Sequence, residues 1–554
     1  MKKLDKLILE YSLQNAVFYN GKVDPKAVLG KILANYKEGR KQVPKIQKMI
    51  ETEVKKINKM KKKEQEAQLK KINPKLLVKE EKKQEPLPPL PDVKGKITTR
   101  FAPSPTGPLM ITHLLRAVFL NYLYAKKYKG KFVLRIEDTD PANTKKKYYE
   151  WIKQDLKKVN VVWDKIIVES DNMKDYYKAA EKMIANDDIY SCRCSPDEFK
   201  YLKQMHMDCG CRDVGPRKTI EDWKKSMEGK INEGEMSFKL KTSMKDPNPA
   251  LRDPTLFRIS KAKHPTKGRK FNVWPLYNFA NVIEDHNNGI THVFRGKEHE
   301  HNTTIQNIIY SKLGWKPPNV LNFGMIYLPG EKFHTRDIRA KIESKELSGW
   351  DDPSLPTVRA LLRRGFQPDA FKESAIDVSI TKNDIKFSWD ILESHNRKII
   401  DPKAKRFMVV TNPVKISITG LKTKKVEAQY HPENPKKGKK IMSVDPKEIY
   451  ITEEDFKIAK KRSVRLKELG NIKKIVGKRG KYLDDILDKK TPKIHWVSRP
   501  NVKVEIIKPD GVIEALGENY MKKLRPSEII QMERFGFGRV DSVGKKIRIL
   551  FTHK

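Results

Sequence analysis

The chain has 554 residues and a formal net charge of +46 at pH 7, with 116 Lys and Arg residues against 70 Asp and Glu residues. This length predicts several domains. The basic balance favours a polyanionic partner, since neutralised phosphates supply most non-specific affinity for nucleic acids, although a solvated lysine-rich surface gives the same composition. No run of 18 apolar residues exists and the first residues lack the apolar stretch of a signal peptide, so we expect a cytoplasmic protein without a membrane span.

Residues 1–84 are predicted to form a helical N-terminal extension, because their apolar residues recur at helical spacing among many charges. On its own this pattern is also that of a generic small helical bundle. Lysine and glutamate alternate over residues 55–83, which is typical of a solvated helix or a partly disordered segment. Residues 85–96 are rich in proline, which predicts a stiff linker and places a domain boundary there.

Residues 97–395 are predicted to form an α/β region that opens with a βαβ unit. A short strand over 98–102 runs into a loop broken by three prolines and Gly107, a helix follows over 113–128, and a buried strand over 132–136 leads into an acidic run. Ligands bind at the carboxyl ends of strands in open α/β sheets. The loop before the helix can offer backbone N–H groups to a phosphate.

All four cysteines of the chain lie within twenty residues of one another, in a CxC–x14–CxC arrangement. Four thiolates in two close pairs can surround a tetrahedral Zn²⁺, although CxxC is the commoner spacing. The alternative is four buried or free thiols without a metal. We favour zinc, because no cysteine lies anywhere else in the chain, and we expect a structural site, since four protein ligands leave no open coordination position for chemistry. The predicted ligands are Cys192, Cys194, Cys209 and Cys211.

After residue 400 the pattern changes to short β-branched runs separated by Pro, Gly and Asn, which predicts an all-β region over 396–554. The runs over 408–411, 414–418 and 502–507 are examples. Short strands at this spacing are typical of a β-barrel. We therefore expect the chain to end in one or more barrels.

The segments RFAPSPTGPL (100–109) and LRIEDTDP (134–141) resemble class I aminoacyl-tRNA synthetases of the glutamyl/glutaminyl branch. SGWDDPSLPT (348–357) and ERFGFGRVD (533–541) extend the resemblance over nearly the whole chain, and the N-terminal pattern is similar to the archaeal glutamyl type. The resemblance implies a multidomain protein with a Rossmann-like catalytic core. It also implies an acceptor-end-binding insertion at about 188–270, where similar cysteine pairs occur in the family, and C-terminal anticodon-binding barrels.

The implied activity is ATP-dependent ligation of glutamate to tRNA(Glu) through a glutamyl-adenylate, with Mg²⁺. The pocket alone does not separate glutamate from glutamine, and tRNA(Gln) stays open as a second substrate. In the family, Arg100 matches the residue that meets the side-chain carboxyl group, while Ser104 and Glu137 match those that hold the α-amino group. Three further residues match the lining of the amino-acid pocket: Tyr277, Asn281 and Arg295. Any one of these charges alone is more commonly part of a structural ion pair.

Both ATP-handling motifs depart from the family pattern. The family motif His-Ile/Leu-Gly-His corresponds to Met110-Ile111-Thr112-His113, and one extra residue lies between His113 and Asn121. Counted back from Asn121, the motif falls on residues 111–114 and neither histidine aligns. In the mobile loop, residues 334–337 replace Lys-x-Ser-Lys, so that the last lysine becomes Asp337; Arg336, Arg339 or Lys332 could supply the missing cation.

The resemblance implies a catalytic set of His113, Thr335 and Arg336, and an ATP-binding set of Pro108, Met110, Thr112, His113 and Arg336. Losing one preorganised donor to a transition-state oxyanion costs roughly 100- to 1000-fold in rate, and here two motifs are altered. Two hypotheses follow: an active glutamyl-tRNA synthetase with altered ATP contacts, which we favour, or a tRNA-binding paralogue with little activation chemistry. A general RNA-binding module explains the charge but not the amino-acid pocket.

Overall fold

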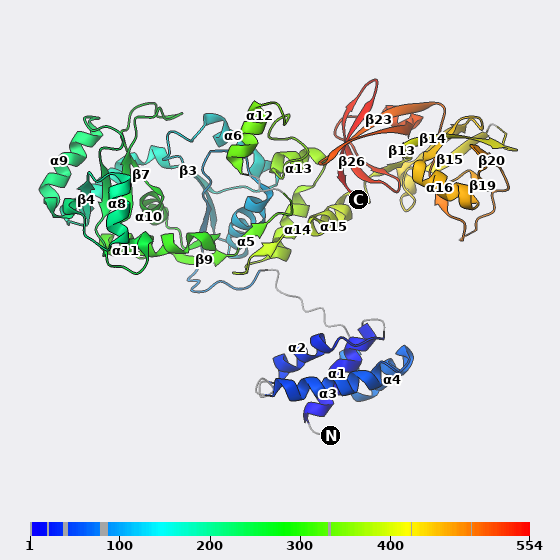
Figure 1. Cartoon of the computed structure of the whole chain (residues 1–554), viewed down its shortest axis with the longest axis horizontal. Coiled ribbons are helices and arrows are strands. Elements are labelled where there is room, and N and C mark those ends of the chain that lie inside the picture. The colour runs from blue at the N-terminus through cyan, green and yellow to red at the C-terminus, as the bar shows by residue number, and fades with distance from the viewer. Residues whose placement is uncertain are drawn as a thin grey trace. The chain divides into compact units, whose positions relative to one another are not determined.

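The computed structural model describes residues 3–18, 21–36, 42–77, 87–330, 334–422, 424–488 and 490–554. It divides into two compact units, Met1–Glu85 and Pro86–Lys554 (Figure 1). The end of the predicted extension (78–84), the first two residues of the predicted linker, and Lys332 lie outside the described residues. Each unit is considered separately below.

The first unit is a bundle of helices, as its periodicity predicts. Its helices are α1 (Lys3–Phe18), α2 (Pro25–Asn35), α3 (Val43–Ile57) and α4 (Lys62–Ile72), followed by a short 3₁₀ turn, Pro74–Leu77. The core contains apolar side chains from all four helices, among them Leu13, Ile32, Ile50 and Leu69. Buried Gln65 donates hydrogen bonds to the carbonyls of Gly21 and Ile57 and so ties α4 to the preceding elements.

A parallel sheet forms the centre of the second unit. Its strands are β1 (Thr98–Phe101), β2 (Lys131–Ile136), β3 (Lys165–Val168), β8 (His292–Gly296) and β9 (Asn319–Phe323). β2 lies between β1 and β3, and β8 pairs with β9, all in parallel. Thr291, just before β8, donates its N–H to the Thr98 carbonyl over 3.0 Å, which brings β8 beside β1. The resulting order, β3–β2–β1–β8–β9, is that of a doubly wound fold.

Helices and one small parallel strand pair surround this sheet. They are α5 (Phe119–Lys127), α6 (Lys146–Lys158), α7 (Met173–Ala185), α10 (Tyr277–Asn287), α11 (Glu300–Leu313), α12 (Thr335–Glu343), α13 (Val358–Arg364), α14 (Pro368–Val378), α15 (Trp389–Ile400), β10 (Ile326–Tyr327) and β11 (Ile385–Lys386). Helices α6 and α7 are amphipathic. They carry apolar residues at helical spacing, such as Ile152 and Leu156, which pack in the core.

The described part of the predicted linker packs on this core. Leu87 and Leu90 are buried against Leu120 and Tyr124 of α5, and the Tyr124 hydroxyl donates to the Pro88 carbonyl over 2.9 Å. The prolines keep this segment extended, and the leucines between them find apolar partners. These residues are therefore part of the second unit and do not form a free spacer.

The first helix of the βαβ unit differs from the regular α-helix that its sequence predicts. Residues His113–Val118 form a π-helical turn, and the α-helix α5 begins only at Phe119. A π turn holds one residue more than an α turn. The extra residue noted between His113 and Asn121 is taken up there, so His113 keeps its place beside the loop while Asn121 keeps its place in the helix.

The insertion has its own antiparallel sheet in the order β4–β5–β6–β7. Its elements are β4 (Ile189–Cys192), α8 (Pro196–Gln204), α9 (Gly215–Met227), β5 (Ser237–Leu240), β6 (Thr255–Ile259) and β7 (Val273–Pro275). Trp223 and Trp274 are fully buried in the core beneath this sheet. The two cysteine pairs lie at its edge: Cys192 ends β4, and Cys209 precedes a short turn before α9.

After α15, which reaches Ile400 and so runs into the predicted region 396–554, the described residues are all-β apart from helix α16 (Glu453–Lys461) and short 3₁₀ turns, as predicted. A seven-stranded sheet joins β12 (Lys405–Phe407), β25 (Ile529–Met532), β26 (Gly536–Val543), β27 (Ile547–His553), β23 (Asn501–Lys508), β24 (Gly511–Glu518) and β13 (Val409–Thr411). Smaller sheets use β14 (Pro413–Thr419), β15 (Lys424–Gln429), β16 (Lys439–Val444), β17 (Ile449–Thr452), β18 (Val464–Leu466), β19 (Gly470–Ile472), β20 (Arg479–Lys481), β21 (Lys493–Ile494) and β22 (Val497–Ser498), next to helix α16.

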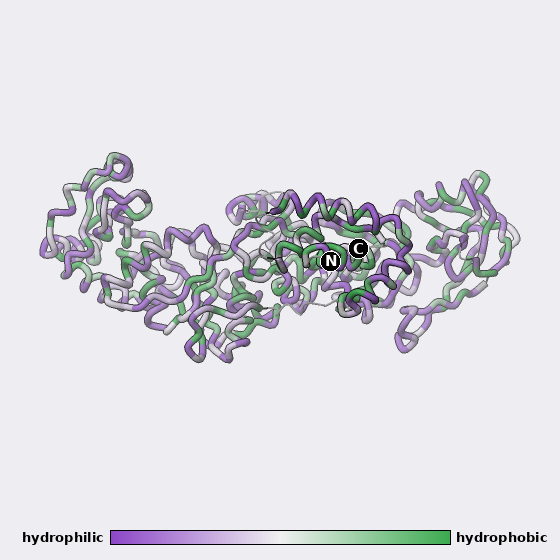
Figure 2. Tube along the Cα trace, turned by 90° about the horizontal axis from the view of Figure 1, so that it is seen from below, coloured by the Kyte–Doolittle hydropathy of each residue, from purple (hydrophilic) through white to green (hydrophobic). Residues whose placement is uncertain are grey.

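Hydrophobic and hydrophilic positions alternate closely along the traced chain (Figure 2). Among the residues that the structure describes, no helix is both long and apolar enough to cross a bilayer.

Candidate active site

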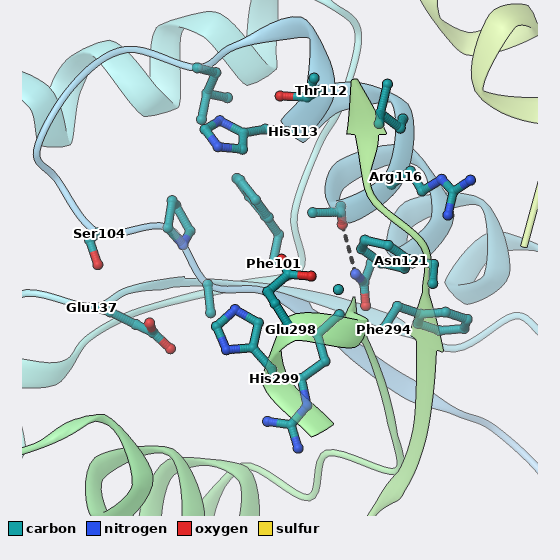
Figure 3. A pocket seen from close by; sticks show the side chains of 18 of the residues that line it. Phe101, Ser104, Thr112, His113, Arg116, Asn121, Glu137, Phe294, Glu298 and His299 are labelled. Atoms are coloured by element: carbon teal, nitrogen blue, oxygen red, sulfur yellow. Dashed lines mark hydrogen bonds between the residues drawn. The ribbon is translucent and has the colours of Figure 1, made fainter. Parts of the chain in front are cut away.

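A cleft of about 650 Å³ opens at the carboxyl ends of the central strands (Figure 3). Its walls come from residues 100–121, the end of β8 with the turn after it, and residues 323–326. Single side chains are added by Glu137 just after β2 and by the first residues of α10 and α12. The predicted site residues that line it are Arg100, Ser104, Pro108, Thr112, His113, Glu137, Tyr277, Arg295 and Thr335. This is the edge where ligands bind in open α/β sheets.

Arg100 stands at the base of the cleft and is held by two residues of α10. Its Nε donates to Asp285 Oδ1 over 3.0 Å and its Nη2 donates to Asn281 Oδ1 over 3.0 Å. Burial by itself raises the pKa of Asp285, but the guanidiniums of Arg100 and Arg135 hold that pKa below its usual range. Asn281 does not line the cleft; it supports Arg100 from behind.

A second buried arginine, Arg135, was not identified from the sequence. Its Nη1 lies 2.6 Å from Asp285 Oδ1, and its Nη2 lies 2.5 Å from Asn281 Oδ1 and 3.0 Å from Glu137 Oε1. Glu137 also accepts from Asn281 Nδ2 over 3.0 Å. The Arg135 guanidinium therefore positions Glu137, which is matched to the α-amino group. It also positions Asn281 and Asp285, the two residues that bind Arg100.

Tyr277 and Arg295 also line the cleft. Arg295 Nη1 donates to Gln306 Oε1 over 2.9 Å, while its buried Nε has no hydrogen-bond partner. The Tyr277 ring stacks on His299, with ring centroids 5.5 Å apart. Burial and nearby Glu137 raise the pKa of Tyr277, so its hydroxyl stays protonated and can donate. His299 also lines the cleft and was missed by the sequence reasoning.

His113 lies on the wall formed by the loop before the π turn. Its Nδ1 accepts a hydrogen bond from the Met110 N–H over 3.2 Å. Desolvation by the surrounding protein lowers the pKa of the imidazole. The ring is therefore neutral near pH 7, and its proton is on Nε2, where it can be donated to a ligand. Figure 3 shows His113 and Thr112 on the loop side of the pocket and His299 facing them.

Met110, predicted to contact ATP, does not line the cleft. Its side chain packs with Ile338 and Trp350, and its backbone bridges Thr357. Met110, which stands where the family has its first histidine, therefore packs in the protein interior and does not face the cleft. Arg116, in the π turn, was not predicted but does line the cleft; its Nη1 donates to the Gly324 carbonyl over 2.7 Å.

The segment that replaces Lys-x-Ser-Lys, expected as a mobile loop, forms the first turn of α12 after its N-cap His334 and reaches the cleft through Thr335. A Cβ built on Gly107 would lie 2.7 Å from the Thr335 methyl carbon, so only glycine fits there. Arg339 Nη2 donates to the Thr106 carbonyl over 2.7 Å and is a support of the loop. The Arg336 side chain is 93% exposed, lies 3.5 Å from Asp337, and does not line the cleft. In this conformation Arg336 is therefore not where the sequence places the missing cation.

The four cysteines are brought together in the insertion, with their sulfur atoms all within 4.8 Å of one another. The Sγ of Cys209 lies 3.7 Å from that of Cys192 and 3.2 Å from that of Cys194. Zn–S bonds of about 2.3 Å in a tetrahedron put sulfur atoms about 3.8 Å apart. The donor set, its compactness and its partial burial fit one Zn²⁺.

An open parallel sheet with a polar cleft at its carboxyl edge defines a nucleotide-binding α/β enzyme. Residues 96–402 match the family described as tRNA synthetases class I (E and Q), catalytic domain. Residues 404–483 and 493–541 match two anti-codon binding domains of the same group. The chain therefore belongs to the class I tRNA synthetases of the E and Q group, a family for which ATP is a substrate used with Mg²⁺.

Curated relatives extend this match over the full length. The glutamate–tRNA ligase of Pyrococcus furiosus is 38% identical over 575 residues, which cover 100% of both chains. That of Methanocaldococcus jannaschii is 38% identical over 549 residues, 97% of this chain and 98% of the relative. Among solved structures, a glutamate tRNA ligase from Elizabethkingia meningosepticum is 21% identical, with a TM-score of 0.41 over 56% of this chain and 70% of that chain.

Proposed function

We propose that the protein is a glutamate–tRNA ligase that activates glutamate with ATP and transfers it to tRNA(Glu). The observation that carries this proposal is the buried set around Arg100, in which the Arg100 guanidinium and the Glu137 carboxylate line the cleft and Arg135 fixes them from behind. A free amino acid needs a cation for its carboxylate and an anion for its ammonium group. Full-length similarity to proteins named glutamate–tRNA ligases supports the substrate.

Activation joins the glutamate α-carboxylate to the α-phosphate of ATP and releases pyrophosphate. In the proposed site, Arg100 binds the side-chain carboxylate, while Glu137 and Ser104 hold the ammonium group. Fixing the two reactants in this way lowers the entropic part of the barrier. The neutral imidazole of His113 donates from Nε2 to a phosphate oxygen, on which negative charge grows in the transition state. Mg²⁺ binds chiefly to the phosphate oxygens and neutralises them.

A hydroxyl of the 3′-terminal ribose of the tRNA then attacks the carbonyl carbon of the glutamyl-adenylate. The new ester bond replaces the bond to phosphate, the hydroxyl proton is lost, and AMP is released. We assign the insertion at about 188–270 to the acceptor end and residues 396–554 to the anticodon. Cys192, Cys194, Cys209 and Cys211 are proposed to hold a structural Zn²⁺ that stabilises the insertion, and zinc supplies no chemistry to ligation. tRNA(Gln) is kept as a second substrate to be tested, and a cytoplasmic location follows for an enzyme of translation.

The altered residues at 110, 112 and 337 motivate the alternative, a tRNA-binding paralogue with little activation chemistry. One ATP–pyrophosphate exchange assay separates the two. We expect exchange with glutamate in the presence of tRNA(Glu), and much less with glutamine. Exchange at background with both amino acids, by protein that still binds tRNA, would overturn the ligase and leave the paralogue.

A further inference from the structure

A buried lysine without an acidic partner lies beside the cysteine cluster. Lys239, in β5, is only 5% exposed. Its Nζ donates to Thr255 Oγ1 over 3.0 Å and lies 3.6 Å from the centroid of the Phe199 ring. Among the ion pairs of the described residues, none includes Lys239. Asp253 is in its surroundings, but Tyr190 and Arg212 already bind that carboxylate.

The strand register directs Lys239 to the side of the sheet that carries the cysteines. Lys239 is the cross-strand partner of Tyr190 in the antiparallel pair β4–β5. Cys192 follows Tyr190 by two residues and therefore points to the same face. Diagonal neighbours on one face are within reach of a long side chain. Phe199, on which the ammonium group rests, belongs to the same buried cluster as Cys192 and Cys209.

The buried ammonium group of Lys239 and the negative charge of a zinc–thiolate centre would compensate one another. Burying an ammonium group without a counter-charge is costly. A zinc ion with four thiolate ligands carries two net negative charges in a partly buried place, which is equally costly without a nearby cation. Two backbone N–H groups already donate hydrogen bonds to the sulfur atoms: that of Arg193 to Cys211 Sγ over 3.5 Å, and that of Cys211 to Cys209 Sγ over 3.4 Å. Neither carries a full charge.

We propose that Lys239 is the counter-cation of the zinc–thiolate centre and sets its metal affinity. This inference rests on the proposed zinc site. Lys239 touches no substrate and binds no metal itself; it acts through the four cysteines. Groups next to the ligands of a metal commonly change its affinity by roughly 10- to 100-fold.

The test uses the full chain with the substitutions Lys239→Met and Lys239→Arg, and Lys200→Met as a matched control. Lys200 follows Phe199 in α8, but its side chain is exposed. Zinc affinity and release are measured by competition with a chromophoric chelator, and the fold is checked by melting temperature in excess zinc. We expect Lys239→Met to weaken zinc binding roughly 10- to 100-fold, and Lys239→Arg and Lys200→Met to stay near the wild type.

Equal zinc affinity in Lys239→Met and Lys200→Met would overturn the counter-cation while leaving the zinc site intact. A wild-type chain that binds no zinc would instead overturn the zinc site itself, and the inference with it. Neither outcome depends on ligase activity, so the assignment of glutamate as substrate is tested separately. Weaker binding in Lys239→Met together with rescue in Lys239→Arg supports the charge, as opposed to the shape, of the side chain.

Discussion

Nη2 of Arg135 lies 2.5 Å from Oδ1 of Asn281 in the interior of the second unit. The same guanidinium binds Glu137 and Asp285, and Asp285 in turn binds Arg100. A residue outside the lining of the cleft thus controls both the anionic and the cationic side of the proposed glutamate pocket.

Replacing Arg135 by lysine should therefore raise the KM for glutamate. A lysine keeps the charge but cannot reach three acceptors at once, and a buried polar group left unpaired costs about 1–3 kcal/mol, which is roughly 5- to 150-fold in binding. The KM for ATP should change less than about two-fold, because the phosphate side of the cleft is untouched. Steady-state exchange kinetics measure both constants. An equal rise in both, with a lower melting temperature, would give Arg135 a merely structural role.

The pocket residues were found from the sequence because they lie in short motifs, whereas their supports were not. Asp285 and Arg135 are 150 positions apart and meet only through the packing of α10 against β2. A charged residue in a buried strand gives no periodic signal of which partner it will find. The C-terminal β-strands and the helices α6 and α7 were predictable because alternation and helical spacing are local properties.

The conformation of the two ATP motifs could not be predicted for a different reason. An extra residue in a helix can either shift the register of all later residues or be accommodated in a π turn, and the sequence is the same in both cases. In the structure it is accommodated in the π turn His113–Val118. The direction of Arg336 depends on how α12 begins, which composition does not fix.

Deleting Leu115 from the π turn should leave the protein folded and active. Removing one residue there converts the π turn into an α turn, while His113 and Asn121 keep their places on either side. One buried leucine is lost, so a melting temperature lower by a few degrees is expected. Deleting Tyr122 from α5 is the control, because each later residue of that helix then turns by about 100°. Circular dichroism and exchange activity distinguish them; equal damage in both variants would refute absorption of the insertion.

Removal of zinc should destabilise the insertion and leave the structure of the cleft unchanged. Protein purified without added metal should contain about one zinc per chain, lost in the double variant Cys192→Ser/Cys209→Ser. That variant should become sensitive to proteolysis between residues 188 and 270, while glutamate activation is reduced less than aminoacylation of tRNA. Metal analysis and limited proteolysis check this. Four freely titrating thiols in a folded wild-type protein would contradict it.

Stability should fall on acidification through His553. Asn396 donates to its Nε2 over 3.0 Å, and burial lowers the pKa of this histidine to about 4. His553 is therefore protonated at a lower pH in the folded state than in the unfolded chain, where its pKa is about 6.5. The contribution of neutral His553 to the free energy of unfolding is fully present above about pH 6.5. It is lost as the pH falls to about 4, which lowers the free energy of unfolding by roughly 3 kcal/mol. Nearby, Arg364 donates to the carbonyls of Phe551 and Thr552 and so ties α13 to β27.

The variant His553→Gln has no such titration and can still accept from Asn396. The drop in melting temperature between about pH 7 and about pH 4.5 should therefore be smaller in His553→Gln than in the wild type. The exposed His301, replaced in the same way, is the control and should leave the drop unchanged. An identical pH profile for all three proteins would contradict the assignment.

The last prediction concerns the cation opposite pyrophosphate. Thr335 lines the cleft, and the side chain of the next residue, Arg336, is 93% exposed. Within the described part of the chain, its ion pair is with Asp337 over 3.5 Å, which leaves the side chain free to turn. A guanidinium can bind phosphate bidentately, and we propose that Arg336 does so when ATP is bound. Arg336→Ala should then slow adenylate formation roughly 100-fold, with the KM for glutamate nearly unchanged, since the contact matters mainly in the transition state.

Asp337→Asn is the matched variant, because it keeps the size of the side chain and removes the carboxylate that competes with phosphate for Arg336. It should raise the rate of pyrophosphate exchange by a few-fold. A lower rate in Asp337→Asn would mean that this carboxylate helps to hold Mg²⁺, which prefers carboxylate and phosphate oxygens. An unchanged rate in Arg336→Ala would exclude Arg336 as the cation, and the transition-state charge would then be met without a side chain from this loop.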